Sequence, residues 1–277
     1  MNTKKCLQIK KIINEADAII IGAGAGLSAS AGLDYSPSSF KKHFPELVKA
    51  YGMTDMYTSS FYEFNSPEER WSYWAKHINY SYISKSAFKT YQNLLKIVQD
   101  KDYFVITTNV DGQFLKAGFN PKKVFEVQGS YNKIQCSAAC HSKTYDNTNM
   151  VKQMLLSKDN LKVPHNLIPY CPICGQEMTI NIRKDDYFVE DQNWYSLNQA
   201  YENFLNNHLH KKIVLLELGV GFNTPGIIRF PFEQLAMTYP NITLVRINNE
   251  NIDSFYELNS NLISLKEDCS IGLKNLL

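Results

Sequence analysis

The glycine-rich segment GAGAGLSASAG, at residues 22–32, constrains the fold of this chain more than any other stretch. It directly follows an apolar run at residues 16–21, which is typical of a buried parallel strand. Its first glycines, at positions 22, 24 and 26, let backbone N–H groups approach a pyrophosphate without interference from a Cβ atom. Ser28 and Ser30 are expected to cap the helix that follows, whose N-terminal end favours anionic groups. Strand, glycine loop and helix in this order predict a dinucleotide-binding arrangement, although many Gly/Ala-rich turns bind nothing.

The overall composition indicates a soluble globular protein. A length of 277 residues suits one large domain, or a domain with a smaller insertion. The net charge of +2 gives no reason to expect a broad basic face, so we expect no nucleic-acid partner. No run approaches the ~20 apolar residues that cross a bilayer, and the lysine-containing residues 1–13 favour a polar helix over a signal peptide. We therefore expect a cytoplasmic protein that does not associate with a membrane.

Apolar runs rich in β-branched and aromatic residues recur at 18–21, 103–107, 213–218 and 242–247. Helical or loop-rich segments separate these runs, and this rhythm predicts an α/β fold with a parallel sheet. Residues 86–99 have helical spacing with one apolar face. The aromatic-rich interval 40–82 favours a packed helical layer, although a wall that covers a substrate would have the same composition.

The α/β rhythm breaks at residues 130–182, which contain two cysteine pairs. In a reducing compartment, such pairs favour a metal over disulfides, and four thiolates suit a tetrahedral structural zinc. The second pair lies in a CPxCG knuckle, where Gly175 is expected to permit a tight turn. His141 is a competing ligand, and four buried free thiols are the alternative to zinc, whereas Cys6 and Cys269 are expected to be ordinary thiols. The predicted ligands are Cys136, Cys140, Cys171 and Cys174.

Polar side chains follow several of the predicted strands. Asn109 and Asp111 leave the strand at 103–107, and Gln128 follows a further predicted strand at 124–126. The segments LGVGFNTP, at 218–225, and RINNE, at 246–250, leave two further strands. Open α/β sheets bind ligands at the carboxyl ends of their strands. Each segment alone could be a mere turn, but together they predict one site.

These motifs, with the cysteine pairs in this place, resemble the sirtuin family from residue 18 to the C-terminus. The matching segments are GAGAGLS, TNVDG, the cysteine quartet, GVG and INNE. The resemblance implies a Rossmann-like sheet with helices on both faces, plus a small zinc-binding insert domain. It implies an NAD-binding domain at 1–129 and 183–277, a zinc module at 130–182 and a helical cap layer at 35–82. NAD would be consumed as a co-substrate.

The departures from the sirtuin pattern concern the catalytic positions. Gln128 precedes Gly129 where sirtuins have a catalytic histidine before glycine, and Thr108 stands where the family has glutamine. Residues 32–36 read GLDYS in place of the usual GIPDFR start, and RKDDYFV at 183–189 is no clear counterpart of the FGE strand that binds acyl-lysine. These features resemble the macrodomain-linked microbial branch, class M. That branch is associated with ADP-ribosylation of lipoyl-carrier proteins, which implies a protein acceptor, such as a lipoylated carrier, and a macrodomain hydrolase as partners.

Glutamine at position 128 has a direct chemical consequence. Sirtuin deacylation needs a general base near neutrality, which histidine supplies and a carboxamide does not. Cleavage of the nicotinamide–ribose bond remains available, because preorganised dipoles can stabilise an oxocarbenium-like ribose. We expect Asp111 to hold the nicotinamide carboxamide, while Asn109 and Gln128 position the ribose. The alternatives are a helix N-cap for Asp111 and a turn spacer for Gln128.

The resemblance also implies a set of residues around NAD. Gly24, Gly26, Ser28 and Gly221 would cradle the phosphates, and Asn248 and Glu250 would lie near the adenosine ribose, unless Glu250 is a solvated loop charge. The full predicted set is Gly22, Ala23, Gly24, Gly26, Leu27, Ser28, Thr108, Gly219, Val220, Gly221, Asn223, Asn248 and Glu250.

The sequence leaves several functions open beside ADP-ribosyl transfer. NAD-dependent protein-lysine deacylation would need water or another residue in place of the histidine. Simple NAD hydrolysis would consume NAD with no labelled acceptor. A non-catalytic NAD or ADP-ribose sensor is compatible with the loss of histidine. A scaffold is the least favoured, because polar residues gather at four strand ends.

Overall fold

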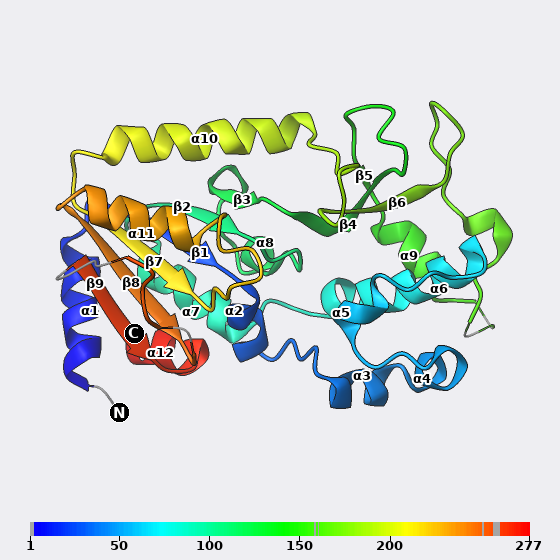
Figure 1. The fold of residues 1–277 in the computed structure, drawn as a ribbon, viewed down its shortest axis with the longest axis horizontal. Coiled ribbons are helices and arrows are strands. Elements are labelled where there is room, and N and C mark those ends of the chain that lie inside the picture. Colours follow the sequence, from blue (N-terminus) through cyan, green and yellow to red (C-terminus); the bar gives the residue numbers. More distant parts are fainter. Residues whose placement is uncertain (1–2, 158, 160, 251, 257–260) are drawn as a thin grey trace. The chain divides into compact units, whose positions relative to one another are not determined.

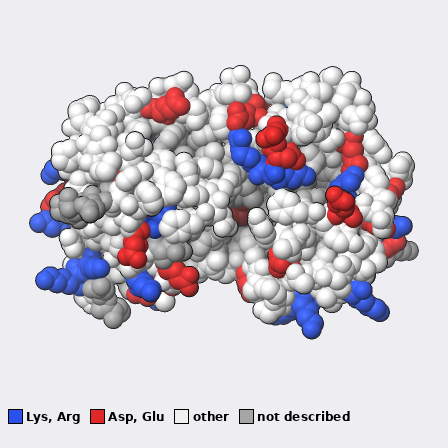
Figure 2. Space-filling model, in the orientation of Figure 1, with Lys and Arg blue, Asp and Glu red and all other residues white. Residues whose placement is uncertain are grey.

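The computed structural model describes residues 3–157, 159, 161–250, 252–256 and 261–277. The chain divides into two compact units (Figure 1). Unit 1 comprises Met1–Gly32, Ala87–Gln128 and Asn193–Leu277, and unit 2 comprises Leu33–Ser86 and Gly129–Gln192. Among the described residues, no helix is long and apolar enough to span a membrane. On the face shown in Figure 2, acidic and basic side chains are interspersed, in line with the small net charge.

Unit 1 is built on a six-stranded sheet in the order β3-β2-β1-β7-β8-β9, in which every neighbouring pair is parallel. The strands predicted from apolar runs are confirmed, because both faces of the central strands are covered. All six residues of β1 and of β7 are buried. The strand bounds are β1 Ala18–Ala23, β2 Asp102–Thr107, β3 Val124–Glu126, β7 Ile213–Leu218, β8 Ile242–Asn248 and β9 Leu262–Lys266.

Helices pack on both faces of this sheet, as the predicted fold class requires. One face contacts α1 (Thr3–Glu15), α2 (Ala25–Ser30), α7 (Lys89–Val98), α8 (Gln113–Lys116) and α12 (Cys269–Asn275). The other contacts α10 (Gln192–His208) and α11 (Arg229–Thr238). The predicted helix at 86–99 is confirmed as α7, whose Tyr91, Leu94 and Val98 enter the core.

The strand order places a topological switch point between β1 and β7. The chain proceeds from β1 outward to β2 and β3, and later returns to the other side of β1 to form β7, β8 and β9. Loops that leave two such strands diverge to opposite sides of the sheet and open a crevice at their carboxyl ends. The glycine loop after β1 and the segment after β7 both begin at this point.

Unit 2 combines a small antiparallel sheet with helices. The sheet has the order β5-β4-β6, with β4 Gly129–Cys136, β5 Tyr145–Asp146 and β6 Met178–Ile182. In α6, the side chains of Arg70 and Trp71 both donate hydrogen bonds to Glu177, which joins the aromatic-rich segment to the cysteine-bearing one. The helical segments are α3 Pro37–His43, α4 Pro45–Tyr51, α5 Met56–Ser59, α6 Pro67–Ile78, the π-helical η1 Asn79–Ile83, α9 Thr148–Met154 and the 3-10 turn η3 His165–Leu167.

Side-chain caps explain where the helices of unit 2 begin. Ser36, Asp55 and Ser66 each accept a backbone N–H three residues further on, at the starts of α3, α5 and α6. Proline then occupies the first turn of α3 and α6, where its missing N–H costs no hydrogen bond. These local signals, and not a long apolar run, define this part of the chain.

Candidate functional site

A cluster of four buried polar side chains lies at the carboxyl edge of the sheet in unit 1. Asn109 and Asp111 directly follow β2, Ser28 comes from α2 and Tyr91 comes from α7. The Ser28 hydroxyl donates to Oδ2 of Asp111 over 2.5 Å, and the Tyr91 hydroxyl lies 2.6 Å from Ser28 Oγ. The structure therefore brings together three of the predicted site residues, and adds a fourth residue that the sequence pattern assigned to the core.

The side chain of Asn109 is held in one orientation. Its Nδ2 donates to the carbonyl oxygen of Gly24 over 3.0 Å, and lies 3.1 Å from Ser28 Oγ and 3.2 Å from the Tyr91 hydroxyl. Its backbone N–H donates to Oγ1 of Thr107 at the end of β2. Because the amide nitrogen is engaged on the protein side, the amide oxygen is the atom that can face a substrate.

Asp111 is a buried carboxylate with two protein donors. Oδ2 accepts from Ser28, and Oδ1 accepts the backbone N–H of Gln113 over 3.0 Å. Burial raises the pKa of Asp111, while these two hydrogen bonds and the charge of Lys116 oppose the rise. The bond to Gln113 is a local turn contact, because the N-cap residue of α8 is Gly112 and no side chain caps this helix. Asp111 is therefore not the helix N-cap that the sequence left as an alternative.

The glycine loop packs closely against the segment that follows β7. The N–H of Gly24 donates to Leu218 O and that of Gly26 donates to Gly219 O. A Cβ at Gly26 would lie 2.8 Å from Gly219 Cα, and Gly219 itself has φ +59° with a Cβ position only 2.3 Å from Leu27 N. These glycines therefore have a packing role at the switch point, and their predicted contact with phosphate stays a prediction.

The expectation that Ser28 and Ser30 cap the following helix is wrong. Helix α2 begins at Ala25, its N-cap residue is Gly24, and no side chain caps it. Both serines therefore lie inside the helix, where Ser30 Oγ donates to Leu27 O. The turn after β1 is so tight that the helix begins before the first serine, which leaves the Ser28 hydroxyl for Asp111.

Gln128 lies at the same carboxyl edge of the sheet, two residues beyond β3. Its neighbour Val127 donates its N–H to Thr107 O, which attaches this segment to the end of β2. The Gln128 side chain is half-buried. Thr108 also stays on this edge, because its N–H donates to Ala23 O at the end of β1.

The remaining predicted residues differ in how firmly they are held. Asn248 ends β8 and donates through Nδ2 to Val220 O, which ties two strand ends together. Gly22, Ala23 and Leu27 are buried in the loop and its helix. Gly221, Asn223 and Glu250 are exposed, and the solvated-charge alternative for Glu250 stays open.

A buried network of ion pairs joins β7, β8 and α11 in unit 1. Arg246 of β8 binds both carboxylate oxygens of Glu217 in β7, over 2.7 and 2.9 Å, and Oε1 of Glu233 in α11 over 2.7 Å. Arg246 and Arg229 both donate to the backbone oxygen of Asp253. The network thus ties Asp253 to the core of unit 1. The sequence signal for this network is a single charged residue inside each of two otherwise apolar strands.

The four predicted zinc ligands converge in unit 2. Their Sγ atoms all lie within 4.8 Å of one another, with 3.5 Å between Cys136 and Cys174 and 3.6 Å between Cys140 and Cys171. Tetrahedral zinc with Zn–S bonds of about 2.3 Å requires sulfur–sulfur separations of about 3.8 Å, so the donor set fits zinc. Gly175 adopts φ +73°, as the predicted tight knuckle requires.

His141 lies beside the cysteines. Its Nδ1 is 3.1 Å from Cys140 Sγ, and its Nε2 is 3.0 Å from the Tyr145 hydroxyl. Because four thiolates already complete a tetrahedron, an imidazole in this place suits a supporting contact to sulfur.

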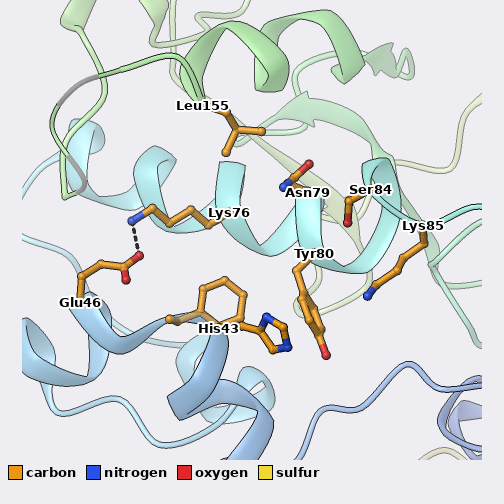
Figure 3. Close-up of a pocket in the computed structure, with 9 residues that line it drawn as sticks. His43, Glu46, Lys76, Asn79, Tyr80, Ser84, Lys85 and Leu155 are labelled. Carbon is orange, nitrogen blue, oxygen red and sulfur yellow. Dashed lines mark hydrogen bonds and ion pairs between the residues drawn. The ribbon is translucent and has the colours of Figure 1, made fainter.

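A cavity of about 350 Å³ lies elsewhere in unit 2, among α3, α4, α6 and η1 (Figure 3). Lys76 forms an ion pair with Glu46, and Lys85 Nζ lies 4.5 Å from the centre of the Tyr80 ring. These two lysines are thus engaged within the protein. None of the residues predicted to bind NAD or zinc lines this cavity.

Comparison with known proteins agrees with this architecture. The Sir2 family profile matches residues 24–210. The chain is 34% identical over 269 residues to a Staphylococcus aureus (strain Mu50) protein named "Protein ADP-ribosyltransferase", which spans 97% of this chain and 85% of that relative. It is 36% identical over 236 residues, 81% of this chain and 39% of the relative, to a Fusarium oxysporum f. sp. cubense protein named "Probable bifunctional ADP-ribose hydrolase/ADP-ribosyltransferase".

A solved structure described as Sir2–p53 peptide–NAD⁺ has the same fold, with a TM-score of 0.58 and 17% identity over 100% of this chain and 97% of the other. At that identity the likeness concerns the fold. The match to the family profile and the identity to the Staphylococcus relative show that this chain belongs to the Sir2 family.

Proposed function

We propose that the chain is an NAD-dependent protein ADP-ribosyltransferase. It cleaves the nicotinamide–ribose bond of NAD and transfers ADP-ribose to a protein acceptor. Two curated relatives that are at least 34% identical carry ADP-ribosyltransferase in their names. The observation that carries the proposal is the buried cluster of Asn109, Asp111 and Ser28 beside the switch point of the sheet, together with glutamine at position 128.

The cluster suits the first chemical step. In our proposal, the Asn109 amide oxygen and the Gln128 carboxamide face the ribose, and Asp111 holds the nicotinamide carboxamide. Fixed dipoles around a ribose that develops positive charge lower the barrier without moving at the moment of reaction. The bond between C1′ and the nicotinamide nitrogen breaks, and nicotinamide leaves as a neutral base. The bond from the acceptor nucleophile to C1′ then forms, and the acceptor's proton passes to solvent.

Glutamine at position 128 favours transfer over deacylation. Deacylation requires a base that withdraws a proton from a ribose hydroxyl, and an amide has no such basicity near neutrality. ADP-ribosyl transfer to a good nucleophile does not need that proton transfer from the sugar. The zinc ion would have no open coordination position among four thiolates, so we assign it the structural role of holding β4, β6 and the knuckle together in unit 2.

A lipoylated carrier protein is the acceptor that we propose, with a macrodomain hydrolase to reverse the modification. The class M resemblance supports both partners. The Fusarium relative, whose name joins ADP-ribose hydrolase with ADP-ribosyltransferase, supports the second. This chain matches 39% of that longer relative.

The test is incubation with NAD labelled in the adenylate half, with purified carrier protein in lipoylated and unlipoylated forms. We expect label on the lipoylated carrier and an equal release of nicotinamide. Asn109→Ala should abolish both, whereas Asn120→Ala should not. Asn120 is the matched control because it is exposed and caps the 3-10 turn η2 (Pro121–Lys123), which leads into the amino end of β3.

Each alternative function gives a distinct outcome in this assay. Nicotinamide release without a labelled protein indicates an NAD hydrolase, and rapid formation of O-acyl-ADP-ribose from an acyl-lysine peptide indicates a deacylase. NAD binding without nicotinamide release indicates a sensor. Equal labelling of both carrier forms would contradict the lipoyl requirement alone.

A further inference from the structure

Tyr91 is a core residue by its ring and a site residue by its hydroxyl. The side chain is fully buried, and its ring meets Phe114 edge to face, with centroids 4.9 Å apart and planes at 87°. This apolar packing fixes the ring without help from the hydroxyl. The hydroxyl ends 2.6 Å from Ser28 Oγ and 3.2 Å from Asn109 Nδ2. A phenylalanine would keep the packing and remove only the polar contacts.

The hydrogen atoms in the cluster can be assigned from chemistry. A serine hydroxyl has one hydrogen to donate and two lone pairs to accept with. Ser28 uses its hydrogen on the Asp111 carboxylate. The groups that approach Ser28 Oγ from Tyr91 and Asn109 must therefore donate to it. Burial and the negative charge of Asp111 raise the pKa of Tyr91 well above its ordinary value, so the phenol keeps its proton to donate.

The direction of these bonds depends on Tyr91. The Asn109 amide nitrogen cannot accept a hydrogen bond, so among the side chains of the described residues that contact Ser28 Oγ, only Asp111 and Tyr91 can accept from it. When Tyr91 donates, Asp111 is the acceptor that remains. Without the phenol, Ser28 Oγ loses one of its two donors, and the Asn109 amide loses one of the three oxygens that hold its nitrogen inward.

We propose that Tyr91 is a positioning residue of the site: its hydroxyl donates to Ser28, directs the Ser28 hydrogen to Asp111 and keeps the Asn109 amide oxygen toward the substrate. This inference deepens the proposed function and rests on it for its catalytic consequence. The hydrogen-bond arrangement itself is testable without catalysis.

The kinetic test compares Tyr91→Phe with Tyr103→Phe. Tyr103 is a buried tyrosine of β2 whose hydroxyl accepts the Asn120 N–H, at the far edge of the sheet, so it is a matched control. For nicotinamide release, we expect Tyr91→Phe to lower kcat about 10-fold with less than about a twofold change in KM, because one oriented hydrogen bond is lost. Tyr103→Phe should leave both constants unchanged. Unchanged kcat in Tyr91→Phe would overturn the proposal.

A double-mutant cycle tests whether Tyr91 acts through Ser28. If it does, Tyr91→Phe should change kcat less than about twofold in a Ser28→Ala background. A full 10-fold loss in that background contradicts the part of the proposal that runs through Ser28, and leaves only the direct contact between the Tyr91 hydroxyl and Asn109 Nδ2. Rates are normalised to the folded fraction from thermal melts, so that a loss of stability does not count as a loss of positioning.

A readout without turnover separates this inference from the proposed function. In ¹H–¹⁵N spectra, the Asn109 side-chain NH₂ pair, assigned by its loss in Asn109→Ala, should shift in Tyr91→Phe and stay in place in Tyr103→Phe. An unmoved pair in Tyr91→Phe would overturn the inference whatever the activity. An inactive wild-type protein with a shifted pair would overturn the proposed function and leave the arrangement of Tyr91 standing.

Discussion

Arg246 binds Glu217 through two parallel hydrogen bonds, of 2.7 and 2.9 Å, inside a sheet where both side chains are wholly buried. Their strands are neighbours in register, with Glu217 opposite Arg246. Burial raises the pKa of Glu217, and the ion pair with Arg246 opposes that rise. Because Arg246 also donates to the backbone oxygen of Asp253, this pair connects the core of unit 1 to Asp253.

The first prediction is that replacing only one partner of this ion pair strongly destabilises the protein. Arg246→Met leaves Glu217 and Glu233 buried without their main partner, and we expect a loss of about 3–5 kcal/mol in the free energy of unfolding. The double variant Arg246→Met with Glu217→Met should recover part of this loss. Lys123→Met, which breaks the half-exposed Lys123–Asp102 pair, is the control and should cost less than about 1 kcal/mol. Urea unfolding measures all of these changes, and similar losses in Arg246→Met and Lys123→Met would contradict this account.

The sheet of unit 1 was predictable where strands are buried on both faces. β1 and β7 are continuous apolar runs, and that pattern located them. β9 was missed because only Ile263 and Leu265 are buried along it, so the edge strand shows no apolar run. The error at Ser28 has a different cause, since the tight turn that starts α2 early depends on the distant Gly219.

The sequence likewise predicted only part of the candidate site. The strand-end rule placed Asn109 and Asp111 on the correct edge, because the carboxyl ends of parallel strands share that edge. Tyr91 could not be assigned, since its partner Ser28 lies 63 positions away and its spacing indicates only a core helix. A tyrosine on an otherwise apolar helix face, with a polar tip that needs a partner, was the available signal.

The second prediction concerns the buried carboxylate. The raised pKa of Asp111 means that the folded state holds the proton more tightly than the unfolded state. The stability that this group contributes is therefore fully present below its ordinary pKa of 3.8 and is lost as the pH rises through the raised value. Relative to wild type, Asp111→Asn should gain stability as the pH rises above about 4, although it loses activity.

Asp55 provides the control of opposite sign for this measurement. Its hydrogen bonds to Thr58 lower its pKa, so the wild-type advantage over Asp55→Asn should shrink as the pH falls below about 4. Urea unfolding at several pH values gives both curves. A difference between wild type and Asp111→Asn that does not change with pH would show that Asp111 titrates normally.

The third prediction uses His77, which lies buried between two tyrosine hydroxyls. Nδ1 is 2.9 Å from the Tyr73 hydroxyl, Nε2 is 2.9 Å from that of Tyr131, and burial lowers the pKa of His77 from 6.5 to about 3. The unfolded chain thus binds a proton that the folded state rejects. The stability contribution is present above pH 6.5 and decreases toward pH 3. At pH 5 we expect a loss of about 2 kcal/mol relative to pH 7.5, at 1.36 kcal/mol per pKa unit. His77→Gln should remove this component, and equal pH slopes for the two proteins would contradict it.

The fourth prediction is one zinc ion per chain, held by the cysteine quartet. Cys171→Ser removes a buried ligand and should lose the metal and the folded state of unit 2, since structural zinc contributes folding free energy directly. Cys6→Ser changes a buried thiol of α1 in unit 1 and should keep the metal. Metal content by mass spectrometry and thiol titration after chelation give the answer. A metal-free wild-type protein with four titratable thiols in unit 2 would establish the alternative of free thiols.

The fifth prediction returns to Gln128 and the base that the site lacks. An amide does not titrate near neutrality, so the pH–rate profile of nicotinamide release should have no step near pH 6.5 in the wild-type protein. Gln128→His places an ionisable ring at the same half-buried edge, and protonation of that ring should lower the rate below about pH 6.5, where a cation opposes a ribose that gains positive charge. Gln128→Asn, which keeps an amide, should retain the flat profile at a lower rate. If the wild-type profile already has a step near pH 6.5, another group supplies the base, and the reason that we give for transfer over deacylation fails.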